Sequence, residues 1–143
     1  MNDLLAALMS WAVTLSGYPA PDHLPDVVLV SHAELVHWAC ADHDCKVLGW
    51  FPPGEKIYLD QGLAPLDSTY SSAVVVHEMV HYLQQRSGHF EHARDGGNCE
   101  GVMQMEHEAY QAQRDFFVRY GVYQPVGAAL HVTANCTPAA SSH

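Results

Sequence analysis

The sequence is poor in basic residues. Its 143 residues include six Lys plus Arg against sixteen Asp plus Glu, which gives a formal net charge of -10. Nucleic acids and anionic membranes bind basic surfaces, so this composition argues against both as partners. The mean hydropathy of -0.09 is typical of neither a disordered tail nor a membrane protein. We expect one soluble globular domain over residues 1–143, because this length supplies one hydrophobic core and is short for two.

The apolar N-terminal stretch lacks the positive charge of a secretion signal. MNDLLAALMSWAVTLSGYPAP contains no Lys or Arg and carries Asp3, whereas a signal peptide begins with a basic region. Leu4, Leu8, Trp11 and Leu15 recur at helical spacing. The stretch therefore predicts an amphipathic helix of the mature protein, packed on the core.

Cysteine is scarce, and no Cys-x-x-Cys pair is present, which argues against zinc ligation by cysteine. Cys40, Cys45, Cys99 and Cys136 allow three disulfide pairings. Cys40 and Cys45 flank the short loop ADHD, and Cys99 and Cys136 could join a helix start to the C-terminal tail. Two bridges indicate a periplasmic or secreted protein. Four reduced, buried thiols in a cytosolic protein are the alternative.

No repeat or low-complexity tract interrupts the chain, and the expected elements follow one another closely. Gly, Pro and capping residues set their limits. We predict the order helix, strand, helix, hairpin, helix, helix, and hence an α+β domain with a small antiparallel sheet. The first helix is followed by a buried strand DVVLV at 26–30 and by a helix capped by Ser31 with Glu34. A hairpin follows, with strands at 46–51 and 56–61 around the turn PPGE. The two long helices run from Asp67 or Ser68 to Gly88 and from Asn98 to before Gly121.

The motif HEMVH at residues 77–81 lies within the first of the two long helices. Residues four apart share one helix face, so His77 and His81 can bind the same metal ion. Glu78 is rotated by about 100° from His77 and can reach a water molecule at the metal without ligating it. Eleven His and seven Glu would produce HExxH by chance in about 4% of shuffled chains. The motif therefore needs support from its surroundings.

A catalytic zinc usually has three protein ligands, so a third ligand is required. The metzincin pattern is excluded, because Gln84 and Ser87 stand where it needs Gly and His. The remaining candidates are His89, His92, Asp95, Glu100, Glu106, His107 and Glu108.

Helical periodicity separates the candidates on the second long helix. Apolar residues at helical spacing predict the buried stripe Val102, Met105, Ala109, Ala112, Phe116 and Tyr120, flanked by Met103, Tyr110, Gln113 and Phe117. Glu106 falls within this inward sector, whereas Glu108 shares the opposite face with Gln104 and Gln111. A carboxylate turned into a core needs a metal or a cation as partner. A buried salt bridge to an arginine is the alternative to metal binding.

The run HEMVHYLQ, followed by Glu106 in EHEAYQAQ, resembles the gluzincin type of zincin metallopeptidase, especially small bacterial members. The resemblance covers roughly residues 46–120. It implies one Zn²⁺ held by His77, His81 and Glu106, with Glu78 as catalytic base. Tyr110 stands where many members have an aspartate that supports a zinc-bound histidine.

The resemblance implies a minimal zincin-like fold and hydrolysis of peptide bonds by a zinc-bound water. It also implies that residues 56–61 form an edge strand along which a peptide substrate can lie. Tyr110 and Tyr120 are candidate donors to the transition state, with core packing as the alternative. Gln84 either bonds within the site or is exposed. His89 and His92 either line the cleft or bind a second metal, with simple solvation as the alternative, and no role is assigned to His131. The alternative function is a non-catalytic binding module that keeps a zincin-like core with a structural zinc.

Overall fold

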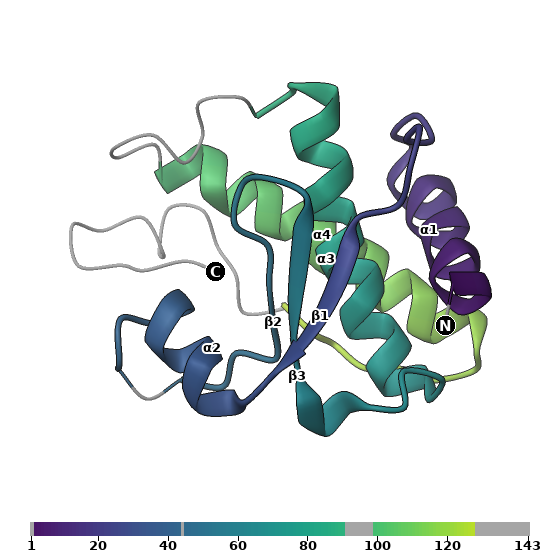
Figure 1. Ribbon diagram of the computed structural model, residues 1–143. Coiled ribbons are helices and arrows are strands. Elements are labelled where there is room, and N and C mark those ends of the chain that lie inside the picture. The colour runs from purple at the N-terminus through teal and green to yellow at the C-terminus, as the bar shows by residue number, and fades with distance from the viewer. Residues whose placement is uncertain (1, 44, 91–98, 128–143) are drawn as a thin grey trace.

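The computed structural model describes residues 2–43, 45–90 and 99–127 (Figure 1). Its elements follow the predicted order and confirm the α+β class. No helix in these three ranges is long and apolar enough to cross a membrane. The elements are α1 (Asn2–Ser16), β1 (Asp26–Val30), α2 (His32–Ala39), β2 (Gly49–Trp50), β3 (Lys56–Asp60), the short 3-10 helix η1 (Gln61–Leu63), α3 (Thr69–Ser87) and α4 (Cys99–Arg119).

The sheet is mixed, so the predicted antiparallel pairing holds for the hairpin and not for the third strand. Its strand order is β1-β3-β2. The predicted hairpin is present, because β2 pairs with β3 in antiparallel fashion, with Gly49 opposite Leu59. Strand β1 runs parallel to β3 from Asp26 opposite Lys56 onward. A parallel pair needs a long connection, and α2 lies in that connection.

Strand β3 lies in the middle of the sheet, which corrects two predictions. Residues 56–61 were expected to form an edge strand, but β3 has a neighbour on each side. Strand β1 was expected to be buried, yet it is an edge strand in which Val30 is buried and Leu29 is 39% exposed. The apolar letters of DVVLV do not distinguish a central strand from one at the edge.

Helix α3 is the centre of the molecule. It contacts β2 and β3 on one side and both α1 and α4 on the other (Figure 1). All residues from 71 to 84 are buried. Val75 and Val76 are 0% exposed, so the burial of their apolar surface outweighs the low helix propensity of valine. The core around them includes Leu5, Leu8 and Ala12 of α1, Ile57 and Leu59 of β3, and Ala109, Ala112 and Phe116 of α4.

The limits of α3 agree with the predicted caps. Ser68 is the N-cap, and its hydroxyl accepts a hydrogen bond of 3.1 Å from the backbone N–H of Ser71. Gly88 ends the helix in the left-handed conformation, with φ of 73°. Asn98, the predicted cap of α4, lies outside the described residues. Tyr120 is 52% exposed, so its prediction as a core residue is wrong, because α4 ends one residue earlier.

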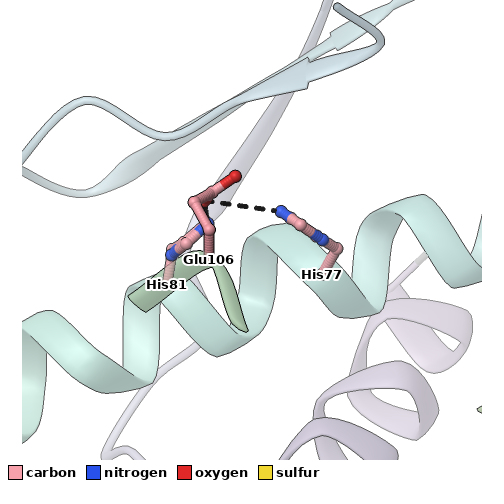
Figure 2. Close-up of side chains that lie close together, drawn as sticks. All are labelled: His77, His81 and Glu106. Carbon is pink, nitrogen blue, oxygen red and sulfur yellow. Dashed lines mark ion pairs between the residues drawn. The ribbon is translucent and has the colours of Figure 1, made fainter. Parts of the chain in front are cut away.

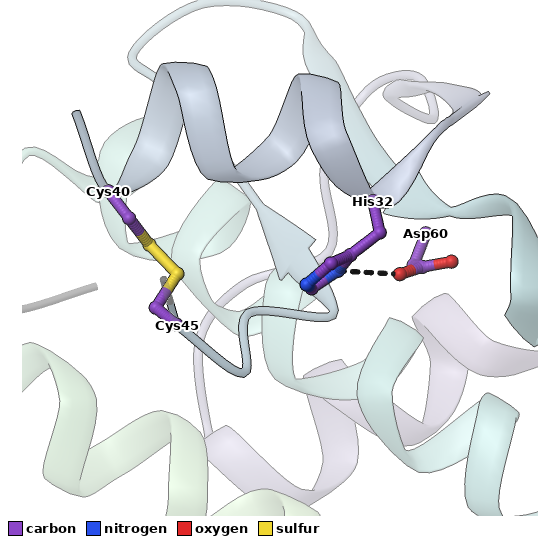
Figure 3. Close-up of a disulfide and its surroundings, with 4 residues drawn as sticks. All are labelled: His32, Cys40, Cys45 and Asp60. Atoms are coloured by element: carbon purple, nitrogen blue, oxygen red, sulfur yellow. Dashed lines mark hydrogen bonds and ion pairs between the residues drawn. A yellow bond between two sulfur atoms is a disulfide. The ribbon is translucent and has the colours of Figure 1, made fainter. Parts of the chain in front are cut away.

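Helix α2 is fastened at both ends (Figure 3). The predicted disulfide between Cys40 and Cys45 joins its C-terminal end to the segment that leads into β2. At the other end, His32 Nδ1 lies 3.0 Å from Asp60 Oδ2 at the end of β3. The second predicted pairing remains a prediction, because Cys99 begins α4 but Cys136 lies outside the described residues.

Candidate metal centre

Three buried side chains meet between α3 and α4. His77 and His81 project from α3 toward Glu106 of α4 (Figure 2). Each offers one ligand atom, and these atoms all lie within 4.8 Å of one another. The three residues are 6%, 2% and 3% exposed, respectively. The group could therefore hold a metal ion.

The inward position predicted for Glu106 is confirmed, and none of the other candidates among the described residues joins the group. Glu100, His107 and His89 are exposed. His92 and Asp95 lie outside the described residues, as does His131. The packing of α3 on α4 thus brings one carboxylate to the two histidines.

Two atoms of the group have the environment expected for metal ligands. His81 Nε2 and Glu106 Oε1 form an ion pair with each other, but both are buried without a hydrogen-bond partner. Glu106 Oε1 also lies 3.7 Å from His77 Nε2. Buried polar atoms without partners are costly, and a cation among them would remove that cost. Two imidazole nitrogens and one carboxylate oxygen form a donor set that suits zinc.

The charges of the site favour a cation. Burial alone would raise the pKa of Glu106, but the two histidines outweigh it and hold this pKa well below its usual range. Burial alone would lower the pKa of His77, but the carboxylates of Glu106 and Glu78 outweigh it and raise this pKa. The two carboxylates thus favour positive charge at this site.

A glutamine supports each histidine. His77 Nδ1 lies 2.9 Å from Gln113 Oε1, and His81 Nδ1 lies 2.8 Å from Gln84 Oε1. Of the two expectations for Gln84, the bond within the site is therefore the observed one. Gln113 was predicted only as part of the stripe's flank. Its place beside the metal centre could have been predicted from the sequence, because Gln113 lies seven residues after Glu106, two helical turns along the same face.

Glu78 lies beside the three-residue group and faces a pocket. It is 6% exposed, and its Oε2 lies 4.0 Å from His77 Nε2. The pocket has a volume of about 290 Å³ and is bordered by residues 45–49, by α3 and α4, and by Val126. Gly49 allows the close approach of β2, because a Cβ atom there would lie 2.9 Å from Cγ of Glu78. Sequence reasoning had no signal for this contact, which joins distant segments.

Tyr110 also borders the pocket. Its ring packs edge-on against His77, with 4.4 Å between the ring centroids. Burial, with the nearby charges of Glu106 and Glu78, raises the pKa of Tyr110 to about 12, so the hydroxyl keeps its proton and can donate a hydrogen bond. Gly127, with φ of 70°, lies against this ring, and a side chain there would collide with it.

Glu108 is partly buried, which corrects its predicted place on the solvent-facing side of α4. Its Oε1 accepts hydrogen bonds from Gln84 Nε2 at 3.0 Å and from the Tyr18 hydroxyl at 2.6 Å. The loop after α1 thus covers a helix face that periodicity assigned to solvent. Burial and the Glu108 carboxylate raise the pKa of Tyr18 in turn. Tyr120, the other tyrosine considered as a donor, packs against Trp11 and Phe116 away from the pocket.

A family model described as "Domain of unknown function (DUF6647)" matches residues 1–142. No curated protein and no solved structure matches the chain.

Proposed function

Because the chain belongs to the family described as "Domain of unknown function (DUF6647)", which assigns no activity, we propose its function from the site: a zinc-dependent peptidase of the gluzincin type. One observation carries this proposal. The buried group of His77, His81 and Glu106 includes two polar atoms without hydrogen-bond partners, and a further carboxylate, Glu78, faces the adjoining pocket.

The proposed mechanism divides the work between the ligands and the residues of the pocket. His77, His81 and Glu106 would hold the zinc ion, which would lower the pKa of a water molecule to about 7 and polarise the substrate carbonyl. Glu78 accepts the proton of the attacking water and passes it to the leaving amine. Tyr110 remains protonated and donates a hydrogen bond to the carbonyl oxygen as negative charge develops there.

The substrate is proposed to be a peptide or protein that lies along β2. Strand β3, the strand first expected to bind it, already has neighbours on both sides. Strand β2 is at the edge of the sheet, and Gly49 and the residues before it border the pocket beside Glu78. An extended peptide that pairs with this edge would pass in front of Glu78. The volume of about 290 Å³ can accommodate one side chain of such a substrate.

The disulfide supports a proposed periplasmic or secreted location. Disulfides persist in oxidising compartments and are rare in the cytosol. The bond between Cys40 and Cys45 holds one end of the segment that borders the pocket, because Cys45 itself is a lining residue.

The proposal is tested by measuring bound zinc and peptide hydrolysis for the wild type and for Glu78→Gln. We expect one zinc ion in both proteins, and hydrolysis of a broad peptide library reduced by roughly 10²–10⁴-fold in the variant, the range for loss of a general base. Glu100→Gln is the matched control, because Glu100 is exposed at the start of α4.

Two outcomes would contradict the proposal. A wild-type protein that binds no zinc would refute the metal centre. Zinc in both proteins with hydrolysis in neither would favour the non-catalytic binding module.

A further inference from the structure

Gln84 is the most completely enclosed polar residue beside the metal centre. It is 0% exposed and uses both ends of its amide. Its Oε1 lies 2.8 Å from His81 Nδ1. Its Nε2 donates to the backbone carbonyl of Met105 and to Glu108 Oε1, each at 3.0 Å.

These partners determine which way the amide of Gln84 points. A carbonyl and an ionised carboxylate can only accept hydrogen bonds. If the amide were turned over, its oxygen would face two acceptors without a proton between them. The NH₂ group must therefore face Met105 and Glu108, so the oxygen faces His81. The orientation of an amide is ordinarily inferred from its network, and here two independent acceptors lead to the same orientation.

The orientation of Gln84 in turn determines the proton position on His81. An amide oxygen can only accept, so Nδ1 of His81 must carry a proton. In the neutral ring, the lone pair is then on Nε2. This nitrogen is the atom that faces Glu106 and lacks a hydrogen-bond partner. The network therefore presents to the proposed ion the nitrogen that is able to bind it.

The network continues to the loop after α1. The Tyr18 hydroxyl donates to the same oxygen of Glu108 at 2.6 Å, which holds the carboxylate in place beside Gln84. Gln113 is less enclosed in comparison. It bonds His77 at 2.9 Å, is 6% exposed and borders the pocket. Of the two glutamines, Gln84 is thus the one whose orientation is set by groups outside the metal centre.

We propose that Gln84, oriented by Glu108 and the Met105 carbonyl, is a positioning residue that holds His81 with Nδ1 protonated and Nε2 free for the metal. This inference rests on the proposed metal centre. Partners of this kind typically change metal affinity by about 10–100-fold when they are replaced.

The first test compares Gln84→Met with Gln85→Met in zinc titrations against a chromophoric chelator. Methionine keeps the length of glutamine but cannot accept from His81 in the same way. We expect zinc affinity to fall by about 10–100-fold for Gln84→Met and to stay unchanged for Gln85→Met, because Gln85 is exposed and bonds Gly54 of the hairpin turn instead. Equal affinities for the two variants would overturn the proposal.

The second test exchanges the amide and the carboxylate. Gln84→Glu alone places two carboxylates where a hydrogen bond of 3.0 Å now lies, so zinc affinity should fall. Adding Glu108→Gln restores a donor at position 108 and should recover part of the loss, because the new carboxylate at position 84 still faces the Met105 carbonyl, which can only accept. A double variant as weak as Gln84→Glu would contradict the proposed role of Glu108.

A measurement on the wild-type protein tests the proton position on His81 without any substitution. Its outcome can also be told apart from a failure of the proposed function. Nitrogen-15 spectra report which ring nitrogen of His81 carries a proton, and we expect a protonated Nδ1 both with and without zinc. A bare Nδ1 would overturn the inference even if zinc binds. Absence of zinc binding with a protonated Nδ1 would instead refute the metal centre and leave the orientation of Gln84 intact.

Discussion

The contact between Gly49 and Glu78 provides a sharp prediction. In Gly49→Ala the added methyl group would lie 2.9 Å from Cγ, 3.1 Å from Cδ and 3.0 Å from Oε2 of Glu78. Carbon atoms pack at about 3.5–4.0 Å, so the shortfall is on the order of 0.6–1 Å. Glu78 is 6% exposed and borders the pocket, so its side chain must move away from β2 toward that pocket. The substitution should therefore displace the proposed base.

A misplacement of about 1 Å in a catalytic group can cost on the order of 10²-fold in rate. We expect kcat for peptide hydrolysis to fall by about this factor in Gly49→Ala, while the zinc content and the thermal unfolding midpoint stay near those of the wild type. Gly62→Ala is the matched control. Gly62 is exposed, and its added methyl group would meet only Asp60 Oδ1, at 3.2 Å.

The assay measures kcat, KM and bound zinc for the wild type and both variants. Full activity in Gly49→Ala would refute the reasoning that the position of Glu78 limits the rate. Loss of zinc in that variant would show instead that the substitution disturbs the ligands.

Two further predictions concern residues of α4. Glu106→Ala should weaken zinc binding far more than Glu108→Ala, because Glu106 lies among the histidines whereas Glu108 reaches His81 only through Gln84. Zinc titrations of the two variants measure this difference in affinity. The reverse order of affinities would refute the ligand assignment. Tyr110→Phe should leave zinc binding unchanged and lower kcat by about 10²–10³-fold, the cost of one lost oxyanion donor; unchanged kcat would leave Tyr110 as a packing residue of His77.

The outcome for α4 shows what periodicity can and cannot predict. The inward turn of Glu106 was predicted, because the spacing of apolar residues along one helix determines which positions share a face. The same argument placed Glu108 on the side exposed to solvent. It failed there because the loop after α1 covers that side and Tyr18 bonds the carboxylate. Periodicity describes a helix by itself and contains no information about a loop from elsewhere in the chain.

The sheet shows the same limit. The hairpin was predicted from its turn residues, since a turn is a local feature. The partner on the other side of β3 was not predicted, because β1 lies thirty residues earlier and joins it in parallel after α2. That pairing made β3 central and moved the proposed peptide-binding edge to β2.

By itself, the sequence determined the helical HEMVH motif, the caps of its helix and the inward position of Glu106. These features depend on residues within a few turns of one another, so local geometry suffices. Only the tertiary structure decided that Met105 and Glu108 orient Gln84 toward His81, that Gln113 supports His77, that Gly49 lies against Glu78 and that β2 rather than β3 is the edge strand of the described sheet beside the pocket. These contacts join segments far apart in the chain, and they exist only because α3 is enclosed by the sheet, α1 and α4.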